Sequence, residues 1–186
     1  AEMLATRGET LEDKVCLVSG SGNVAQYAVE KINQLGGKAV TLSDSSGYIY
    51  DESGIDENKL EFVLDLKNVR RGRISEYCDE FPEAVFTPAD ASLGYNPLWA
   101  HKAHCAFPCA TQNELNEHDA RTLAANGVTC VAEGANMPCT LEAVEVLHHG
   151  RVLYAPGKAS NAGGVATSGL EMSQNAQRLC WTHAEV

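Results

Sequence analysis

The sequence of 186 residues contains no apolar run that approaches the roughly 18 residues a helix needs to cross a bilayer. Its first residues also lack the basic and then apolar layout of a secretion signal. Basic residues are scarce, with 14 Lys and Arg against 25 Asp and Glu, which gives a formal net charge of −11. This balance argues against general binding of nucleic acid or of an anionic membrane. We therefore expect a soluble, cytoplasmic protein that binds neither.

The cysteines do not make an even-numbered disulfide framework, because there are seven of them. Most lie in apolar or strand-like segments, so we expect buried free thiols. A zinc site is the alternative, since four potential ligands lie close together in the sequence at His101, His104, Cys105 and Cys109. The segment has no second Cys-x-x-Cys pair, and we predict no metal site.

Residues 15–25, V-C-L-V-S-G-S-G-N-V-A, are typical of a strand, a tight turn and a helix. In a dinucleotide-binding unit Gly20 allows the turn, and Gly22 lets the backbone approach a pyrophosphate closely. A second strand, predicted at 39–42, ends at Asp44. This carboxylate lies 22 residues beyond Gly22, near the spacing of about 20 expected for a ribose-binding acid. The pattern predicts a nucleotide site.

Strand and helix patterns alternate along the rest of the chain. Apolar runs predict strands at 84–87, 105–107, 128–132 and 152–155, and a small hairpin around 48–50. Helices are predicted at 56–69, at 74–81, from a cap at Asn113 or Asn116, from a cap at Thr140, and after 160. The alternation predicts one doubly wound, Rossmann-like α/β domain over 1–186, with a mostly parallel sheet and helices on both faces.

A basic cluster follows the helix predicted at 56–69, at Lys67, Arg70, Arg71 and Arg73. It forms either a solvated helix end, where cations suit the helix dipole, or a phosphate site. The two interpretations predict different cofactors. Asp44 alone favours NAD, because a carboxylate repels a 2′-phosphate, whereas nearby cations and the hydroxyl of Ser45 favour NADP.

Polar loops follow the other strands, where the ligand crevice of an open α/β sheet lies. We expect Thr111 and Gln112 to meet a nicotinamide and its ribose, and Asn136 to bind a carboxamide. The glycine-rich segment from Asn161 to Ser168 is expected to form a second ligand surface, because glycines destabilise a helix unless a ligand or backbone comes close.

The chain resembles the hexameric, microbial-type glutamate dehydrogenases in segments such as S-G-S-G-N-V-A-Q-Y-A, S-D-S-S-G, P-C-A-T-Q-N-E-L, A-E-G-A-N-M-P and P-G-K-A-S-N-A-G-G-V-A-T-S-G-L-E-M-S-Q-N. The resemblance implies reversible reductive amination of 2-oxoglutarate with ammonia to L-glutamate, using NADP(H) or, less favoured, NAD(H). It implies that 1–186 is the coenzyme domain of a longer, homohexameric chain, without the catalytic Lys and Asp of the N-terminal domain and without a C-terminal helical segment. A non-catalytic nucleotide-binding module and a branched-chain amino acid dehydrogenase are the alternatives.

The same resemblance implies roles for individual residues. The pyrophosphate loop corresponds to Ser19, Gly20, Ser21, Gly22, Asn23 and Val24. Contacts to the ribose and nicotinamide correspond to Ala110, Thr111, Gln112 and Asn136. The S-D-S-S-G segment, with Lys67 and Arg73, resembles NADP-preferring members. Substrate contacts correspond to Asn161, Val165 and Ser168, whose hydroxyl reaches the distal carboxylate. His104 departs from the family pattern and is expected to bring a titratable imidazole near the nicotinamide loop.

Overall fold

The computed structural model describes residues 1–182, 184 and 185. Its centre is a five-stranded sheet in the order β2-β1-β6-β7-β8, in which every neighbouring pair is parallel. These strands are β1 (Val15–Val18), β2 (Lys38–Ala39), β6 (Cys105–Phe107), β7 (Cys130–Ala132) and β8 (Leu153–Ala155). The mostly parallel α/β fold predicted from the sequence is thereby confirmed.

A second sheet of three antiparallel strands lies beside the first, made of β3 (Thr41–Asp44), β4 (Gly47–Tyr50) and β5 (Val85–Pro88). The predicted hairpin is the β3–β4 pair. The strand pairing corrects two predictions. The strand expected at 39–42 is divided at Val40 between the two sheets, and the strand expected at 84–87 pairs with β4 instead of joining the parallel sheet.

A side chain explains the division. Beyond Val40, Thr41 bonds to β1 through its hydroxyl, which accepts from the Val18 amide at 2.9 Å and donates to the Val18 carbonyl at 3.0 Å. The backbone of β3 is therefore free to pair with β4, from Thr41 opposite Tyr50 to Asp44 opposite Gly47.

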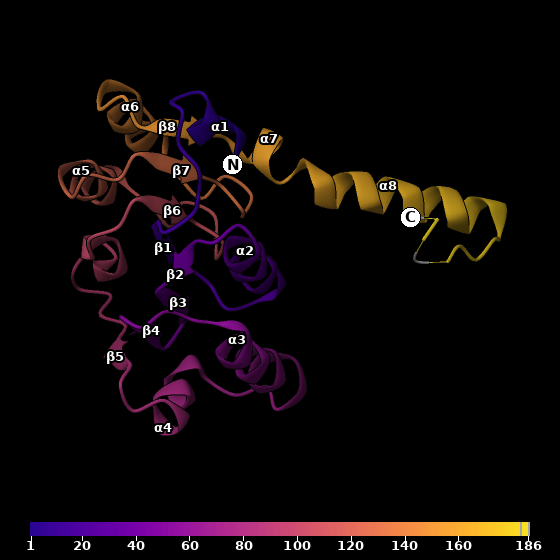
Figure 1. Cartoon of the computed structure of the whole chain (residues 1–186), viewed down its shortest axis with the longest axis horizontal. Coiled ribbons are helices and arrows are strands. Elements are labelled where there is room, and N and C mark those ends of the chain that lie inside the picture. The colour runs from indigo at the N-terminus through magenta and orange to yellow at the C-terminus, as the bar shows by residue number, and fades with distance from the viewer. Residues whose placement is uncertain (183, 186) are drawn as a thin grey trace.

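Helices cover both faces of the parallel sheet (Figure 1). The helices α2 (Asn23–Gln34) and α3 (Glu57–Leu64) lie on one side, and α5 (Glu117–Ala125) and α6 (Leu141–His149) lie on the other. Successive residues of β1 point to opposite faces. Cys16 and Val18 are buried in the core beneath α2, whereas Leu17 is buried in the core beneath α5 and α6.

Three helices begin at the caps expected from the sequence. The side chain of Asp56 accepts from the Lys59 amide at α3, and that of Thr140 accepts from the Ala143 amide at α6. Of the two candidates for α5, Asn116 is the cap. The remaining helical elements are α1 (Glu2–Ala5), η1 (Asp65–Val69), η2 (Ile74–Glu76), α4 (Tyr77–Glu80), η3 (Pro97–Ala100), α7 (Gly157–Ser160) and α8 (Ala162–Gln177).

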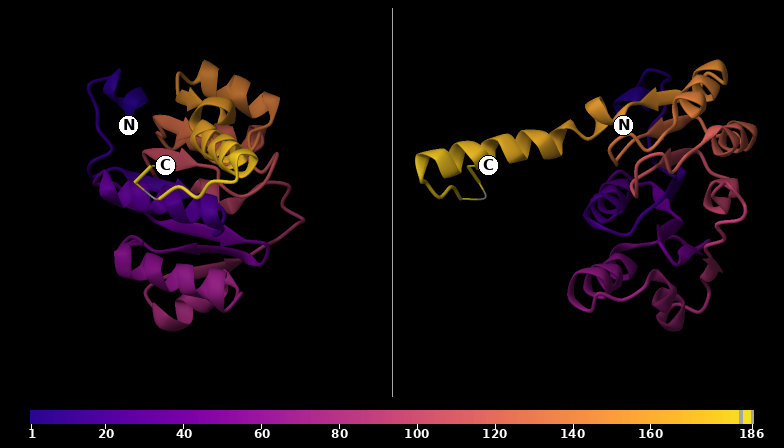
Figure 2. Two further views of the ribbon diagram at one scale, coloured as in Figure 1. Left: turned by 90° about the vertical axis from the view of Figure 1, so that its right-hand side faces the viewer. Right: turned by 180° about the vertical axis from the view of Figure 1, so that it is seen from behind.

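Helix α8 projects from the body of the molecule, as the views from the front, side and back agree (Figures 1 and 2). None of its residues is buried. Over the described part of the chain, none of the helices combines the length and the apolar character that a membrane span requires. Five of the seven cysteines are buried free thiols, which confirms the expectation for most of them.

Candidate functional site

The turn that follows β1 has a geometry that requires glycine at its first position. Gly20 has a φ of 81°, and a Cβ placed on it would lie 2.8 Å from the carbonyl oxygen of Cys109. Gly22 is the N-cap of α2, and a Cβ there would meet no protein atom within 4 Å. Because the first amides of a helix have no partner inside the helix, this open side of α2 is suited to an anion.

Hydrogen bonds hold the turn against its neighbours. The hydroxyl of the fully buried Ser19 accepts from the Cys109 amide at 2.9 Å. The Gly20 amide donates to the Ser43 hydroxyl at 2.7 Å, and the Ser43 amide donates back to the Gly20 carbonyl at 2.9 Å. The carboxyl ends of β1, β3 and β6 therefore meet at one edge of the fold.

A crevice of about 650 Å³ lies over this edge. The structure brings to it most of the residues that sequence reasoning assigned to the cofactor, namely 20–24, Asp44, Ser45, Lys67, Ala110 and Thr111. Ser19 lies beneath the crevice, and the other lining residues are Ser43, Asn96, Cys109 and Glu114. Segments that lie far apart in the sequence thus share one cavity.

Asp44 lies at the end of β3, but its carboxylate is occupied by donors from the protein. Oδ1 accepts from the amide and hydroxyl of Ser46, and Oδ2 accepts from Lys67 Nζ at 3.0 Å and from the Ile74 amide at 2.9 Å. Burial raises the pKa of Asp44, but these hydrogen bonds outweigh burial and lower the pKa from 3.8 to about 2. The carboxylate therefore stays ionised and holds Lys67 in place.

Two cations lie beside Asp44 and Ser45. Lys67, in η1, donates to Asp44 and to the Gly72 carbonyl at 2.8 Å, which leaves one of its three protons without a protein acceptor among these bonds. Arg73 does not line the crevice itself, but its Nη1 donates to the Ser45 hydroxyl at 2.8 Å. The two cations thus lie beside two carboxylates, Asp44 and Glu76, whose Oε1 accepts from the Arg73 amide at 2.7 Å.

The opposite wall is the segment that follows β6. Glu114 Oε1 accepts from the Ala110 amide at 2.8 Å, and this bond holds the loop that carries Thr111. Burial raises the pKa of Glu114 above its ordinary value. Sequence reasoning missed this residue, although a carboxylate directly after a polar loop and before the buried Leu115 was a signal that could have found it.

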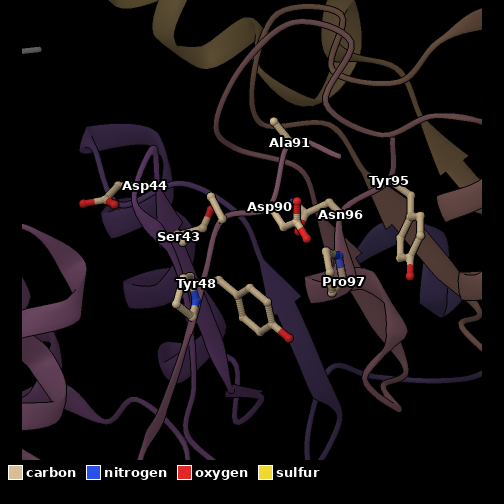
Figure 3. Close-up of a pocket in the computed structure, with 11 residues that line it drawn as sticks. Ser43, Asp44, Tyr48, Asp90, Ala91, Tyr95, Asn96 and Pro97 are labelled. Carbon is tan, nitrogen blue, oxygen red and sulfur yellow. The ribbon is translucent and has the colours of Figure 1, made fainter. Parts of the chain in front are cut away.

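A smaller pocket of about 230 Å³ adjoins the crevice and shares Ser43, Asp44 and Asn96 with it (Figure 3). In Figure 3, Tyr95, Asn96 and Pro97 lie on one side of this pocket and Ser43 and Asp44 on the other. Sequence reasoning described this segment only as loop. Asn96 is the N-cap of η3, where its Oδ1 accepts from the Leu98 amide at 3.1 Å, and its backbone amide donates to Asp119 Oδ1 at 3.0 Å. The Asn-Pro pair was a local signal for this cap, whereas the contact with Asp119 joins residues 23 positions apart.

The remaining predicted residues do not line the crevice. Gln112 and Asn136 are exposed. Asn161 lines a neighbouring groove of about 510 Å³, which shares Val24 and Cys109 with the crevice, and it donates to the Ala135 carbonyl at 3.2 Å. Val165 and Ser168 are exposed on α8, which leaves the body of the molecule (Figure 2). Among the described residues, Asn136 and the segment from Asn161 to Ser168 thus lie outside the lining of the crevice.

His104 lies at the other end of β6 from the Ala110 loop, which corrects the expectation that its imidazole is close to that loop. Its Nδ1 accepts from the Val15 amide at 2.9 Å, at the start of β1. His101 stacks on Tyr50 with ring centroids 4.0 Å apart. In residues 1–182, 184 and 185, no three His, Cys, Asp or Glu side chains are placed to hold a metal ion, so the zinc alternative has no support.

A glycine turn at the carboxyl end of the first parallel strand, opening on a helix N-terminus, defines the Rossmann class of dinucleotide-binding domains. The chain belongs to the glutamate/leucine/phenylalanine/valine dehydrogenase family, which matches residues 1–186.

Similar proteins are glutamate dehydrogenases. The NAD(P)-specific glutamate dehydrogenase of Xylanibacter ruminicola is 59% identical over 185 residues, which are 100% of this chain and 40% of that protein. The NADP-specific enzyme of Haemophilus influenzae is 55% identical, covering 99% of this chain and 39% of that protein. The crystal structure of Plasmodium falciparum glutamate dehydrogenase superposes with a TM-score of 0.89 at 44% identity, covering 99% of this chain and 38% of that chain. This chain thus spans about two fifths of their length.

Proposed function

We propose that this chain is the coenzyme-binding part of an NADP-dependent glutamate dehydrogenase, which interconverts 2-oxoglutarate and ammonia with L-glutamate. The observation that carries the cofactor choice is the group of Ser45, Lys67 and Arg73 at the end of β3. The family and the identities of the similar proteins support the reaction. The catalytic Lys and Asp of such an enzyme, and a C-terminal helical segment, belong to parts of the longer protein outside 1–186.

The 2′-phosphate of NADP fits the corner beside Asp44. A phosphate accepts strong, charge-assisted hydrogen bonds from Lys and Arg. Lys67 has a proton available there, and Arg73 and Ser45 already bond to each other, so the group is ordered before the ligand arrives. Asp44 is not free to accept from a ribose, because its oxygens already take four hydrogen bonds. Its role is to position Lys67.

The pyrophosphate fits the start of α2. Space for it comes from Gly22, where no protein atom lies within 4 Å of a Cβ position, and charge complementarity comes from the helix amides. The adenine fits the adjoining pocket in Figure 3, where Pro97 and Tyr95 offer apolar surface and Asn96 offers polar atoms. When bound, the cofactor supplies the hydride chemistry, and the chain's own task is to hold and orient it.

The nicotinamide half of the cofactor extends toward Ala110, Thr111 and Gln112, with Asn136 on the next loop. Asn161, Val165 and Ser168 are proposed to face the substrate, with the Ser168 hydroxyl on its distal carboxylate. The exposure of Val165 and Ser168 on α8 leaves them available to a neighbouring domain or substrate, and Asn161 is half-buried beside the start of that helix. We infer a homohexamer in the cytoplasm for the full-length enzyme, because the chain resembles hexameric glutamate dehydrogenases.

Calorimetric titration with NADP and NAD at low salt tests the cofactor proposal. Lys67→Ala and Arg73→Ala should each weaken NADP binding about tenfold or more, because a hydrogen bond to a charged group contributes about 1.5 kcal/mol or more. NAD binding should change little. Arg70→Ala is the matched control, since Arg70 belongs to the same basic segment but pairs with Asp65 at 2.8 Å.

Equal binding of NAD and NADP by the unaltered chain would reverse the cofactor choice. The basic segment would then be a solvated helix end. Failure to bind either nucleotide would refute the proposed function as a whole.

A further inference from the structure

Two carboxylates line the crevice, and they are held in different ways. Asp44 is paired with Lys67 at 3.0 Å. Glu114 belongs to none of the ion pairs formed by the described residues. It lies in the wall opposite the basic corner, in the same cavity as the first residues of α2.

The contacts of Glu114 are hydrogen bonds from neutral groups. Oε1 accepts from the Ala110 amide at 2.8 Å, and the Ser19 hydroxyl and the Thr111 amide are donors near the carboxylate that lower its pKa. Burial raises the pKa of Glu114, and these three donors offset only part of that effect. The free crevice therefore already holds an acid that is unusually easy to protonate.

The charged groups around Glu114 favour its neutral form or leave it unaffected. Asp119, buried behind it on α5, raises its pKa further. Cys109 beside it is a neutral thiol, because burial raises its pKa to about 12. Burial also raises the pKa of Cys139, so this thiol stays neutral as well.

The far wall of the crevice does not supply a compensating cation. Lys67 is committed to Asp44, whose pKa is about 2 and which stays ionised near neutral pH. Glu114 is therefore the lining carboxylate whose charge can respond to an anion that enters the crevice.

We propose that a dinucleotide entering this crevice draws one proton from solvent onto Glu114. The pyrophosphate brings negative charge into the same cavity and displaces water, and both changes disfavour a carboxylate. Protonation of one oxygen leaves the other as an acceptor for the Ala110 amide, so the loop can keep its position. This inference rests on the proposed function, because it takes a dinucleotide as the ligand.

The proton uptake has a defined sign. The pKa of Glu114 is higher with the ligand bound than without it, so affinity is highest below both values and falls as pH rises between them. The dissociation constant should rise by up to about tenfold per pH unit within this window. Glu114 is a positioning residue in this scheme, since it acts on the nucleotide through its charge and through the Ala110 loop.

Calorimetry of NAD binding to the chain tests the proposal, at one pH in buffers with different ionisation enthalpies and then across a pH series. NAD is the chosen probe because it lacks the 2′-phosphate, which titrates itself. We expect a buffer-dependent binding enthalpy that corresponds to uptake of up to about one proton. Glu114→Gln should bind NAD with that dependence lost, because an amide oxygen still accepts from Ala110 but takes up no proton.

Glu117→Gln is the matched control, since Glu117 is an exposed carboxylate on α5 that pairs with Arg121 at 2.6 Å, and it should keep the proton uptake. A buffer-independent enthalpy throughout the pH series refutes the inference without any variant, so the test survives if Glu114→Gln fails to fold. Proton uptake that persists in Glu114→Gln also refutes it. Either result leaves the proposed function intact, whereas absence of NAD and NADP binding refutes both.

Discussion

Replacing Asp44 by Asn tests the hydrogen-bond network at the end of β3. The Asp44 side chain is only 11% exposed, and its pKa is about 2 instead of 3.8. A difference of nearly two pKa units corresponds to about 2 kcal/mol of folding free energy. An amide cannot accept from both Lys67 and Ile74 while it also accepts from Ser46. We therefore expect Asp44→Asn to lower the free energy of unfolding at pH 7 by about 2 kcal/mol.

The pH dependence of this loss has a predicted direction. The folded-state pKa of Asp44 is lowered, so its stabilising effect is present above the unfolded value near 4 and disappears as pH falls toward 2. Urea unfolding followed by circular dichroism should show that Asp44→Asn and the unaltered chain differ less in free energy of unfolding at pH 3 than at pH 7, by about 1 kcal/mol. Asp90→Asn is the control, since Asp90 bonds to the amide and hydroxyl of Ser92 on the surface without a cation.

The same substitution separates two roles for Asp44 in binding. If Asp44 positions Lys67, Asp44→Asn weakens NADP binding, because the ammonium loses its bond at 3.0 Å. If Asp44 acts by repelling the 2′-phosphate, the substitution tightens NADP binding. Tighter binding would refute the positioning role of Asp44. Unchanged stability at pH 7, or a stability loss that is the same at pH 3 and pH 7, would refute the stabilising role of its hydrogen bonds.

Three further substitutions test the fold, two in the turn after β1 and one at a buried ion pair beneath α3. Gly20→Ala should lower the free energy of unfolding by at least about 2 kcal/mol in thermal unfolding, because φ is 81° and the Cβ would lie 2.8 Å from the Cys109 carbonyl oxygen. Gly22→Ala should fold normally and lose nucleotide affinity, because its Cβ would meet no protein atom within 4 Å. Equal unfolding temperatures of the two variants would contradict this. Lys59→Ala should lower the free energy of unfolding in urea by about 3 kcal/mol, since the fully buried Asp51 loses its only cationic partner among the ion pairs of the described residues, at 2.6 Å; an unchanged midpoint would contradict this.

Local patterns predicted the helices and much of the site, because their physical causes are local. A cap such as Asp56 or Thr140 bonds to amides three residues ahead, so the sequence shows both partners. The Gly-x-Gly turn was recognisable for the same reason, since a positive φ at Gly20 is a property of a single residue. The choice between Asn113 and Asn116 was harder, because both precede the apolar pattern of α5.

The errors arose where partners are distant in the sequence. The apolar run at 39–42, after α2, indicates burial of this segment. It does not show that the Thr41 hydroxyl replaces backbone pairing to Val18. The bond between Asp44 and Lys67 joins residues 23 positions apart, so sequence reasoning took the two as opposing signals for the cofactor. The local pattern after residue 160 also does not show that α8 extends away from the domain and leaves Ser168 outside the crevice.

The overall charge of −11 and the proposed binding of an anionic cofactor are compatible because electrostatic effects at the site are local. At physiological ionic strength, exposed charges are largely screened beyond about 8 Å, so acidic residues elsewhere contribute little in the crevice. Lys67, Arg73 and the start of α2 would act on the cofactor at contact distance, well inside this screening length, and Lys67 is also partly buried. Asp44 adds a negative charge to this corner but fixes the ammonium that would meet a phosphate. Cofactor preference therefore depends on how the acid at the end of β3 is hydrogen-bonded, and its presence in the sequence alone is insufficient to predict NAD.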